Sequence, residues 1–336
     1  MSQNLRLSKL FNNIKCLIFF ITAFLSLNFW VNGLTTDSNN IYQIETREDL
    51  FEFAKVVNGT HETIKQDEGA NATLINDINI IESDDEIEIL LDLIENEGSN
   101  VDKLKNLEWT PIGNNIKNSY TGTFDGQDKN IKNIYCDISS KNRNAAGLFG
   151  FLGPEGKIKN INVNNVYIKT REGKEANYAG GICGYNDAGN IIECLCEKAR
   201  ICSINGHYGN YSGGICGYNI GMGRISMCTS KDVNIVSTDG NGNNFSGGIC
   251  GYNAGSIIQC FSGIRKLLSK DGQYYNDIGC ICGKNINSII ECYYSKDFQE
   301  DSNDVIEEKK DIDSQIEPCA ESKYKYILIK TVDDID

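Results

Sequence analysis

The sequence predicts an all-β protein: a parallel β-helix solenoid with a short N-terminal helix and strand cap and an acidic helical insertion. The first observation behind this prediction is the phrase GGICGYN, which occurs three times, at 180–186, 213–219 and 247–253. Looser copies stand at 147–150 (GLFG) and 279–285 (GCICGKN), and the closing glycines follow one another at steps of 34, 33, 34 and 32 residues. A fixed period of this length indicates copies of one supersecondary unit stacked on their neighbours.

The second observation is that each unit contains short strand-like pieces and no long apolar stretch of helical period. Gly, Asn and Asp interrupt the pieces, which favours strands joined by turns. In the unit 213–246 we expect strands around 215–216, 225–228 and 233–236. The Asn, Gly and Ser residues before the next GGIC are expected to form a protruding loop. The predicted units are 147–179, 180–212, 213–246, 247–278 and 279–297.

Stacked coils place equivalent residues above one another, about 4.8 Å apart. One isoleucine ladder and one asparagine ladder are therefore expected, and asparagine suits a corner because it tolerates the left-handed conformation. Three tyrosines would stack in the same way, with Lys284 in place of a fourth. The predicted ladders are Ile182, Ile215, Ile249 and Ile281; Asn186, Asn219, Asn253 and Asn285; and Tyr185, Tyr218 and Tyr252.

Residues 34–146 are predicted to form a cap module in front of the repeats. Tyr42 and Ile44 suit a short strand, and Thr46 with Asp49 suits the start of a helix. Four apolar residues then share one helical face: Leu50, Phe53, Ala54 and Val57.

The cap module contains an acidic insertion at 81–106, in which 84–95 has the spacing of a short amphipathic helix. The insertion and the acidic C-terminal tail, 298–336, each carry a net charge of −7, which accounts for the formal charge of −14 of the whole chain. The repeats are therefore close to neutral, so no nucleic-acid partner is expected. Calcium binding by Asp84, Asp85 and Glu86 is an alternative to a solvated acidic face, but no EF-hand spacing accompanies these residues.

The N-terminus resembles a secretory signal. Residues 1–33 carry a basic start and a short apolar run, and cleavage is expected after Gly33. The alternative is an uncleaved signal anchor. The chain is then expected to be secreted or displayed at the cell surface, with no stable membrane span after removal of the signal. Asn-x-Ser/Thr sequons make four residues candidate glycan acceptors: Asn58, Asn71, Asn210 and Asn244.

The order of motifs along 41–297 resembles proteins that carry the Glug motif. The matching segments are IETREDLFEFAKVVN, LINDINI, WTPIG, YTGTFDGQ, GLFG and the GGICGYN units, of which the first begins at Ile44. The resemblance implies a secreted or surface right-handed β-helix of the adhesin-like kind, and it implies no catalytic residues. This chain departs from the family pattern by placing Cys before the closing glycine in four units.

Eight cysteines recur within the repeats and appear or disappear in pairs. One prediction is a disulfide across a corner of each coil. The alternative is two ladders of buried thiols that act as small hydrophobic residues. The predicted pairs are Cys183 with Cys194, Cys216 with Cys228, Cys250 with Cys260, and Cys282 with Cys292. Metal binding is disfavoured for the close groups Cys194, Cys196 and Cys202, and Cys280 with Cys282, because Cys-x-x-Cys spacing is missing and the chain has only two histidines. No metal or cofactor is therefore expected.

Catalysis finds little support. Four acids inside the coils share no column that would build a polysaccharide-cleaving groove: Asp187, Glu193, Asp232 and Glu291. His61 and Glu62 lack the second histidine of a metallopeptidase motif. We therefore expect no catalytic residues, although a polysaccharide-degrading enzyme is kept as an alternative.

The favoured hypothesis is adhesion to an extracellular ligand, either a glycan or a host or matrix protein. A solenoid offers a long regular face with loops on one side. Tyr208, Tyr211 and Phe245 in the predicted loops are the candidate ligand contacts. A purely structural spacer is the remaining alternative.

Overall fold

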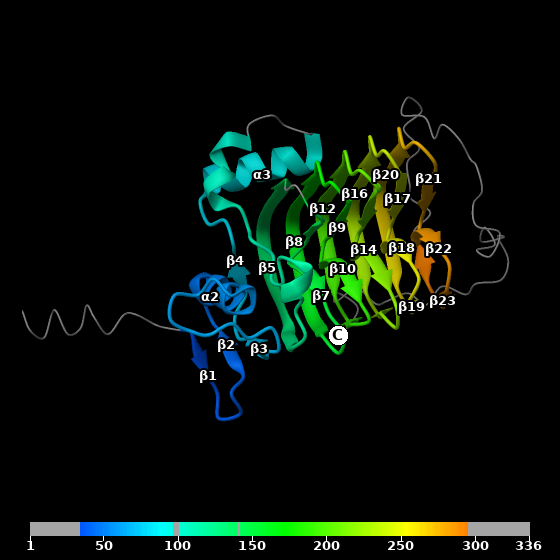
Figure 1. Ribbon diagram of the computed structural model, residues 1–336. Helices are drawn as coiled ribbons and strands as arrows, with labels where there is room; N and C mark the ends of the chain where they lie inside the picture. The colour runs from blue at the N-terminus through cyan, green and yellow to red at the C-terminus, as the bar shows by residue number, and fades with distance from the viewer. Residues whose placement is uncertain (1–33, 97–100, 140–141, 295–336) are drawn as a thin grey trace, which may run out of the picture.

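The structure is a computed structural model, and it describes residues 34–96, 101–139 and 142–294. The chain winds into stacked coils whose equivalent strands pair in parallel to form three sheets (Figure 1). The prediction of a parallel β-helix is confirmed. The predicted signal peptide, 1–33, and the predicted acidic tail, 298–336, lie outside the described residues, as does the end of the last predicted unit.

Each coil passes through the three sheets in turn. The first sheet, here called the GGIC sheet, contains β7 (Phe149–Leu152), β10 (Cys183–Asp187), β14 (Cys216–Ile220), β18 (Cys250–Asn253) and β22 (Cys282–Asn285). The chain then enters the large sheet, and it returns through the Asn sheet. The Asn sheet contains β6 (Asn144–Ala146), β9 (Ala176–Gly180), β13 (Gly209–Gly213), β17 (Asn243–Gly247) and β21 (Asn276–Gly279).

The large sheet receives a short and a long strand from each later coil. The short strands are β11 (Asn190–Ile192), β15 (Arg224–Ser226), β19 (Ser256–Ile258) and β23 (Ser288–Ile290). The long strands are β12 (Leu195–Ile204), β16 (Thr229–Thr238) and β20 (Phe261–Lys270), followed by β24 (Tyr293–Tyr294). In the first coils both parts run as one strand, in β5 (Thr123–Ser139) and β8 (Lys157–Arg171).

The cap closes the first coil. The strands β2 (Tyr42–Ile44), β3 (Ala72–Leu74) and β4 (Ile78–Asn79) extend the large sheet, and β1 (Thr35–Thr36) pairs antiparallel with β2. Helix α2 (Arg47–Asn58) begins with the expected capping box between Thr46 and Asp49. The four apolar residues predicted for its inner face are all buried against the solenoid core.

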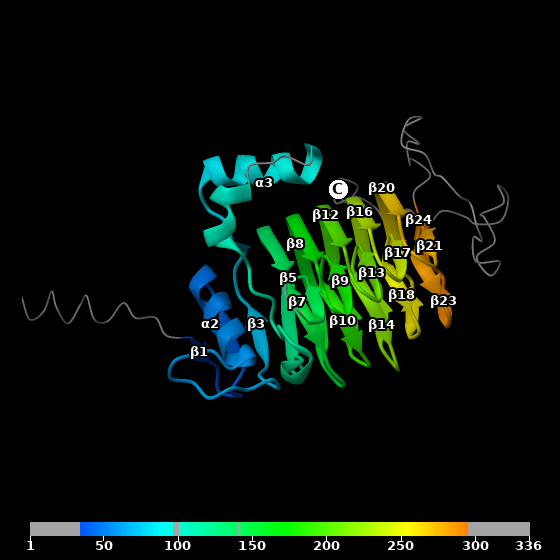
Figure 2. The same ribbon diagram turned by 45° about the horizontal axis from the view of Figure 1, so that its top comes forward.

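The acidic insertion forms α3 (Asp84–Asn96), followed by the short 3₁₀ turns η1 (Val101–Lys103) and η2 (Lys105–Leu107); η3 (Ile116–Asn118) comes later in the cap. The predicted helix is confirmed. Figure 2 shows α3 lying across the ends of the long strands. Leu90, Leu93 and Ile94 pack there on the stacked rings of Tyr135 and Tyr167, so the charged face of the helix is turned outward.

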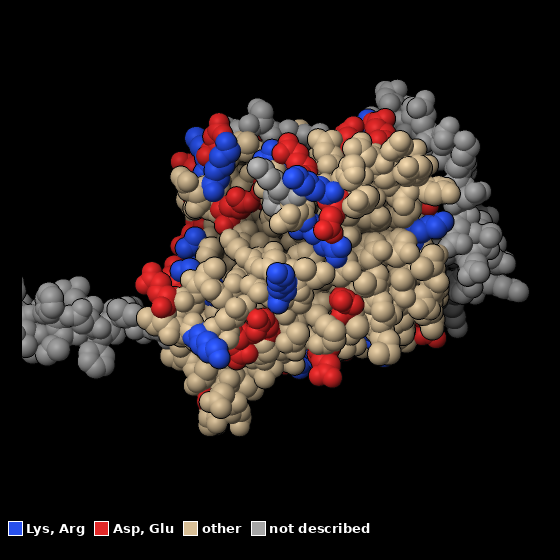
Figure 3. Space-filling view, viewed as in Figure 1, with Lys and Arg blue, Asp and Glu red and all other residues tan. Residues whose placement is uncertain are grey.

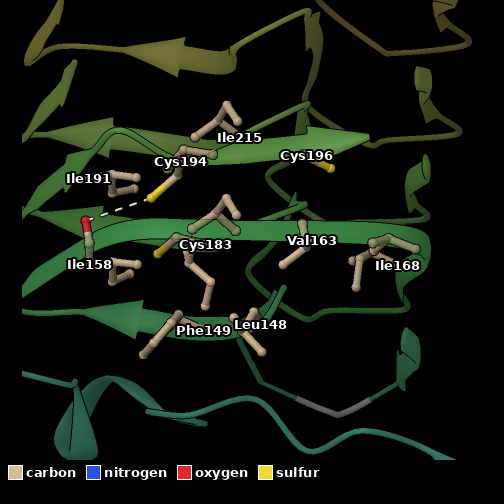
Figure 4. Close-up of a cluster of buried hydrophobic side chains, with 14 of the residues drawn as sticks. Leu148, Phe149, Ile158, Val163, Ile168, Cys183, Ile191, Cys194, Cys196 and Ile215 are labelled. Carbon is tan, nitrogen blue, oxygen red and sulfur yellow. Dashed lines mark hydrogen bonds between the residues drawn. The ribbon is translucent and has the colours of Figure 1, made fainter. Parts of the chain in front are cut away.

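The coil interior contains stacked aliphatic and sulfur side chains (Figure 4). The expected isoleucine ladder is fully buried or nearly so at all four positions. The asparagine ladder is also confirmed: Asn186 Nδ2 donates to Asn219 Oδ1 over 2.7 Å, Asn219 to Asn253 over 2.7 Å, and Asn253 to Asn285 over 2.7 Å. Each amide thus joins one coil to the next.

One part of the predicted coil was wrong. The Asn, Gly and Ser stretch before each GGIC does not form a protruding loop but supplies the strands of the Asn sheet. Its asparagines form a second ladder, in which Asn177 donates to Asn210 over 3.0 Å and Asn210 to Asn244 over 2.9 Å. Sequence reasoning missed this strand because Asn, Gly and Ser have low intrinsic strand propensity, whereas here the amides stack across coils.

Within the described ranges, no helix is both long and apolar enough to cross a bilayer.

Candidate ligand-contact surface

Aromatic rings form a double row where the GGIC sheet meets the Asn sheet. We call this the tyrosine ladder; its members are Phe151, Tyr185, Tyr218 and Tyr252 from the GGIC sheet and Tyr178, Tyr211 and Phe245 from the Asn sheet. The ladder is a cluster separate from the coil interior. Tyr178 belongs to it, whereas the next residue, Ala179, packs in the interior core, as strand alternation requires.

Ring geometry holds the ladder together in two directions. Along the coil axis, Tyr185 stacks on Tyr218 at 5.3 Å and Tyr218 on Tyr252 at 4.6 Å, with interplanar angles of 7° in both pairs. Between the sheets, Tyr178 meets Tyr185 edge to face at 4.9 Å. Such pairs each contribute about 0.5–1.5 kcal/mol beyond area burial. The predicted stacking of Tyr185, Tyr218 and Tyr252 is therefore confirmed, and its role is chiefly structural.

A cation closes the N-terminal end of the ladder. The Arg143 guanidinium lies over the rings of Tyr178 and Tyr185, 6.0 and 5.7 Å from their centroids. The same group forms an ion pair with Glu175 over 2.6 Å. Burial raises the pKa of Tyr178 and of Tyr218, so the phenols stay neutral at physiological pH.

Exposed aromatic residues lie on the neighbouring turns between the large sheet and the Asn sheet. Tyr208 is 63% exposed and Tyr274 is 69% exposed. The register of β13, β17 and β21 aligns Tyr208 with Gly242 in the next coil and with Tyr274 in the coil after that. Two strand spacings separate Tyr208 from Tyr274, which is about 10 Å along the axis. A Cβ on Gly242, the position between the two rings, would collide with the Tyr208 carbonyl group, so a residue with a side chain does not fit there.

The turn of Tyr208 is ordered by its neighbours. The imidazole of His207 lies against the Tyr208 ring at 4.8 Å, and Asn241 Nδ2 is 3.5 Å from His207 Nδ1. Tyr275, next to Tyr274, is also 63% exposed. We call Tyr208, Tyr274 and Tyr275 the aromatic turn row.

The three predicted ligand contacts are thus divided. Tyr208 is exposed on its turn as expected, but Tyr211 and Phe245 are buried within the tyrosine ladder. The prediction for these two was wrong because they sit in a strand whose rings pack against the GGIC sheet. Tyr274 and Tyr275 were missed, although the alignment of Tyr274 with Tyr208 could have been found from the repeat period.

Three of the predicted glycan acceptors are buried amides. Asn210 and Asn244 are fully buried in the second asparagine ladder, and Asn58 accepts from the Gly113 and Asn114 amides while donating to the Pro111 carbonyl. A glycan on any of them would break these contacts, so the folded structure contradicts the prediction. Asn71 is exposed and remains a predicted acceptor.

The cysteine pairs predicted within coils are likewise contradicted, since all eight are free thiols: Cys183, Cys194, Cys216, Cys228, Cys250, Cys260, Cys282 and Cys292. The strand register instead places Cys183 beside Cys216, Cys216 beside Cys250, and Cys250 beside Cys282. The second column stacks in the same way. The sequence alternative of two thiol ladders is therefore the observed arrangement.

Backbone carbonyls satisfy these thiols. Cys183 Sγ donates to the Tyr185 carbonyl over 3.4 Å, and Cys194 Sγ to the Ile192 carbonyl over 3.3 Å, each two residues away. Figure 4 shows Cys183 and Cys194 among aliphatic side chains. Burial raises the pKa of the Cys183, Cys228 and Cys250 thiols, which suppresses the reactive thiolate.

We expect the ladder thiols to resist alkylation in the native protein. Treatment with N-ethylmaleimide at pH 8 should modify the seven buried ladder cysteines only after denaturation, because burial makes their thiols inaccessible; half-buried Cys292 is the exception. Peptide mapping without reduction checks this expectation. Disulfide-linked peptides joining Cys183 to Cys194, or the equivalent pair of another coil, would contradict it.

No group of three or more His, Cys, Asp or Glu side chains within 34–96, 101–139 and 142–294 is arranged to hold a metal ion. Several coil acids instead join neighbouring coils. Asp232 pairs with Arg265 over 2.7 Å, and Glu197 with Lys231 over 2.8 Å.

Comparison with known proteins gives three matches. Residues 208–236 match the family model described as the GLUG motif. A segment of 58 residues is 41% identical to halomucin of Haloquadratum walsbyi; it covers 17% of this chain and 1% of halomucin. Among solved structures, a candidate immunoglobulin A1 protease from Bacteroides ovatus aligns with a TM-score of 0.47 and 16% identity, over 78% of this chain and 77% of that one.

The family match falls on most of one turn of the solenoid. It starts at Tyr208, passes through β13 and β14 with the central GGICGYN phrase, and ends in β16. This chain is a parallel β-helix that carries the GLUG motif.

Proposed function

We propose that this protein is exported and binds an extracellular glycan through the aromatic turn row, without catalysing a reaction on it. The observation that carries the proposal is the pair Tyr208 and Tyr274, two exposed rings in one column with Gly242 at the position between them. Exposed aromatic rings bind the apolar faces of sugar rings by stacking. A spacing of about 10 Å suits an extended oligosaccharide better than a single sugar.

The underlying structure favours this use of the row. Ring contacts of the tyrosine ladder join the Asn sheet to the GGIC sheet. The turns that carry Tyr208 and Tyr274 therefore extend from strands that are held on both sides by packing. Rigid aromatic anchors lose little conformational entropy on binding. His207 and Asn241 add polar groups beside Tyr208 that could bond sugar hydroxyls.

Surface charge supports a neutral ligand. Figure 3 shows that the face carrying β10, β14 and β18 is mostly uncharged, with single acids and bases among the uncharged side chains. Such a face offers no electrostatic attraction for a nucleic acid and little for a strongly anionic polymer. Export is proposed from the signal-like residues 1–33.

The test is a binding screen on arrayed polysaccharides and matrix glycoproteins, followed by titration with the best hit. Y208A and Y274A should each weaken binding about tenfold or more, as expected for loss of an aromatic anchor. Met222, which is 88% exposed on a turn of a different edge, provides the control variant M222A, expected to bind like the wild type.

Three results would count against the proposal. The absence of saturable binding would favour a spacer, and release of new sugar ends from the hit would favour an enzyme. Equal binding by wild type, Y208A and Y274A would place the contact elsewhere on the protein.

A further inference from the structure

The turns that carry the aromatic turn row keep a fixed register from coil to coil. Tyr208 donates its backbone N–H to the Glu175 carbonyl over 2.7 Å, and Tyr274 donates to the Gly242 carbonyl over 3.3 Å. These bonds continue the parallel ladders of β9, β13, β17 and β21 into the turns. Positions on the turns are therefore separated by whole strand spacings, and Tyr208 and Tyr274 lie two spacings apart along the solenoid axis, about 10 Å.

Backbone packing determines which coils can carry a ring in this column. The Cβ that any other residue would place at Gly242 would meet the backbone carbonyl of Tyr208. Because the obstacle is backbone, rotation of a side chain cannot remove it. The coil between the two rings is therefore restricted to glycine, and a ligand that contacts both rings must present the same surface at every second coil step.

A column of polar side chains runs beside the rings. His207, Asn241 and Gln273 occupy the position immediately before the ring column, one in each of three successive coils. All three are exposed. This surface thus offers one hydrogen-bonding side chain at every coil step of about 4.8 Å, and one aromatic ring at every second step.

One class of carbohydrate polymer has the same repeat. In a pyranose chain linked 1,4 through two equatorial bonds, each sugar advances by close to one strand spacing, about 4.8 Å, and is turned over relative to the sugar before it. The same ring face therefore returns at every second sugar. Chains linked through an axial bond or through position 3 curve, so their sugar faces do not return at this distance along a straight line.

We infer that the ligand of the aromatic turn row is an unbranched β-1,4-linked pyranose chain that lies along the solenoid axis, with one sugar to each coil. This inference rests on the glycan-binding function proposed above and specifies the ligand class. Tyr208 stacks on the first of three successive sugars and Tyr274 on the third, while the middle sugar lies over Gly242. The polar column bonds hydroxyls along one edge of the chain. Polymers of glucose and of N-acetylglucosamine share this geometry.

Titration of the full chain with oligosaccharides of defined length tests the inference. The probes are the di-, tri- and hexasaccharides of β-1,4-linked glucose and of β-1,4-linked N-acetylglucosamine, compared with α-1,4-linked and β-1,3-linked glucose chains of the same lengths. In at least one β-1,4 series the trisaccharide should bind about tenfold or more tightly than the disaccharide, because only the longer chain reaches both rings. The series with this gain identifies the sugar. The α-1,4 and β-1,3 chains should show no such gain.

Single substitutions connect the length dependence to the rings. Y208A and Y274A should each bind the trisaccharide no more tightly than the disaccharide, because one ring remains. Disaccharide binding should fall by only about twofold in either variant, since it uses one ring at a time. The exposed control M222A should keep the full gain of the wild type. Circular dichroism of each variant, matched to the wild type, shows that the solenoid is folded.

Two results overturn the inference while the proposed function stands. The first is a ligand from the glycan screen that needs Tyr208, with no gain between two and three sugars in either β-1,4 series. The second is a Y274A variant that keeps the gain, because the third sugar then contacts another part of the protein. If no carbohydrate binding depends on Tyr208, the proposed function fails together with the inference.

Discussion

Gly217→Ala is expected to lower the free energy of unfolding by about 3 kcal/mol or more, the range of severe overpacking. A Cβ on Gly217 would lie 2.7 Å from the Ala179 amide nitrogen, 2.7 Å from the Gly184 carbonyl oxygen and 2.9 Å from the Tyr211 carbonyl oxygen. All three are backbone atoms of paired strands, so no side-chain rotation relieves the contact. The GGIC sheet approaches the Asn sheet this closely because the closing glycine of each unit has no side chain.

Denaturant titration followed by circular dichroism measures the effect. Gly263→Ala is the matched control, since its Cβ would approach no atom closer than 3.5 Å, and replacing a strand glycine there should be neutral or stabilising by up to about 1 kcal/mol. An unfolding midpoint for G217A equal to that of the wild type would show that the two sheets are not packed as described.

The repeat period was sufficient to predict the coil and three of its columns. A residue that recurs every 32–34 positions must stack on its equivalent when strands pair in parallel, whatever its side chain. The ladders of Ile182, Asn186 and Tyr185 follow from this rule alone. Helix α2 was predictable for a different reason, because Thr46 and Asp49 form a local capping box that needs no tertiary information.

The Asn sheet could not be predicted in this way. Asn210 and Ser212 lie in a segment that single-residue propensities assign to a loop. They also form an Asn-x-Ser sequon, which suggested that the segment is exposed. In the fold the Asn210 side chain bonds the amides of neighbouring coils, an interaction that exists only once the coils are stacked. The error at Tyr211 and Phe245 has the same origin, since both lie in the strand taken for a loop.

Two cysteines that are present or absent together in each repeat need not form a disulfide. Cys183 and Cys194 vary together between units, which disulfides would explain. Packing of the coil interior explains the same joint variation. In the preceding coil, Phe149 is in register with Cys183 and buried Ile161 takes the place of Cys194, so larger side chains replace both cysteines. Packing density alone therefore couples the two columns.

Asn219→Leu is expected to lower the free energy of unfolding by about 3–5 kcal/mol. The Asn219 amide is fully buried; it accepts from Asn186 and donates to Asn253 and, over 3.1 Å, to the Gly223 carbonyl. Leucine has the same branched shape as asparagine, but it leaves polar groups on both neighbouring coils without hydrogen-bond partners. The free-energy cost of these unpaired buried groups exceeds the net contribution of the hydrogen bonds to stability. Asn190→Leu, at a half-buried position of β11, should change stability by less than about 1 kcal/mol. Comparable losses for N219L and N190L would contradict the ladder as the cause.

Asn219→Asp changes the hydrogen bonding of the position and leaves its side-chain volume almost unchanged. The pH dependence of the variant's stability therefore reports on the hydrogen bond. An ionised carboxylate can accept from Asn186, but it cannot donate to Asn253 Oδ1, which lies 2.7 Å from Asn219 Nδ2 in the wild type. Burial and this facing acceptor should raise the pKa of the introduced carboxyl in the folded state above its unfolded value of about 3.9. Because the folded protein then holds the proton more tightly than the unfolded chain, the loss of unfolding free energy in N219D relative to wild type should be smallest below about pH 4 and grow as pH rises.

Unfolding free energies measured on both proteins from pH 3.5 to 8 give this difference directly, because the effects of the other carboxyl groups cancel. A deficit that stays constant across the range would mean that the position is hydrated, in which case the amide column could not be what specifies the register of one coil on the next.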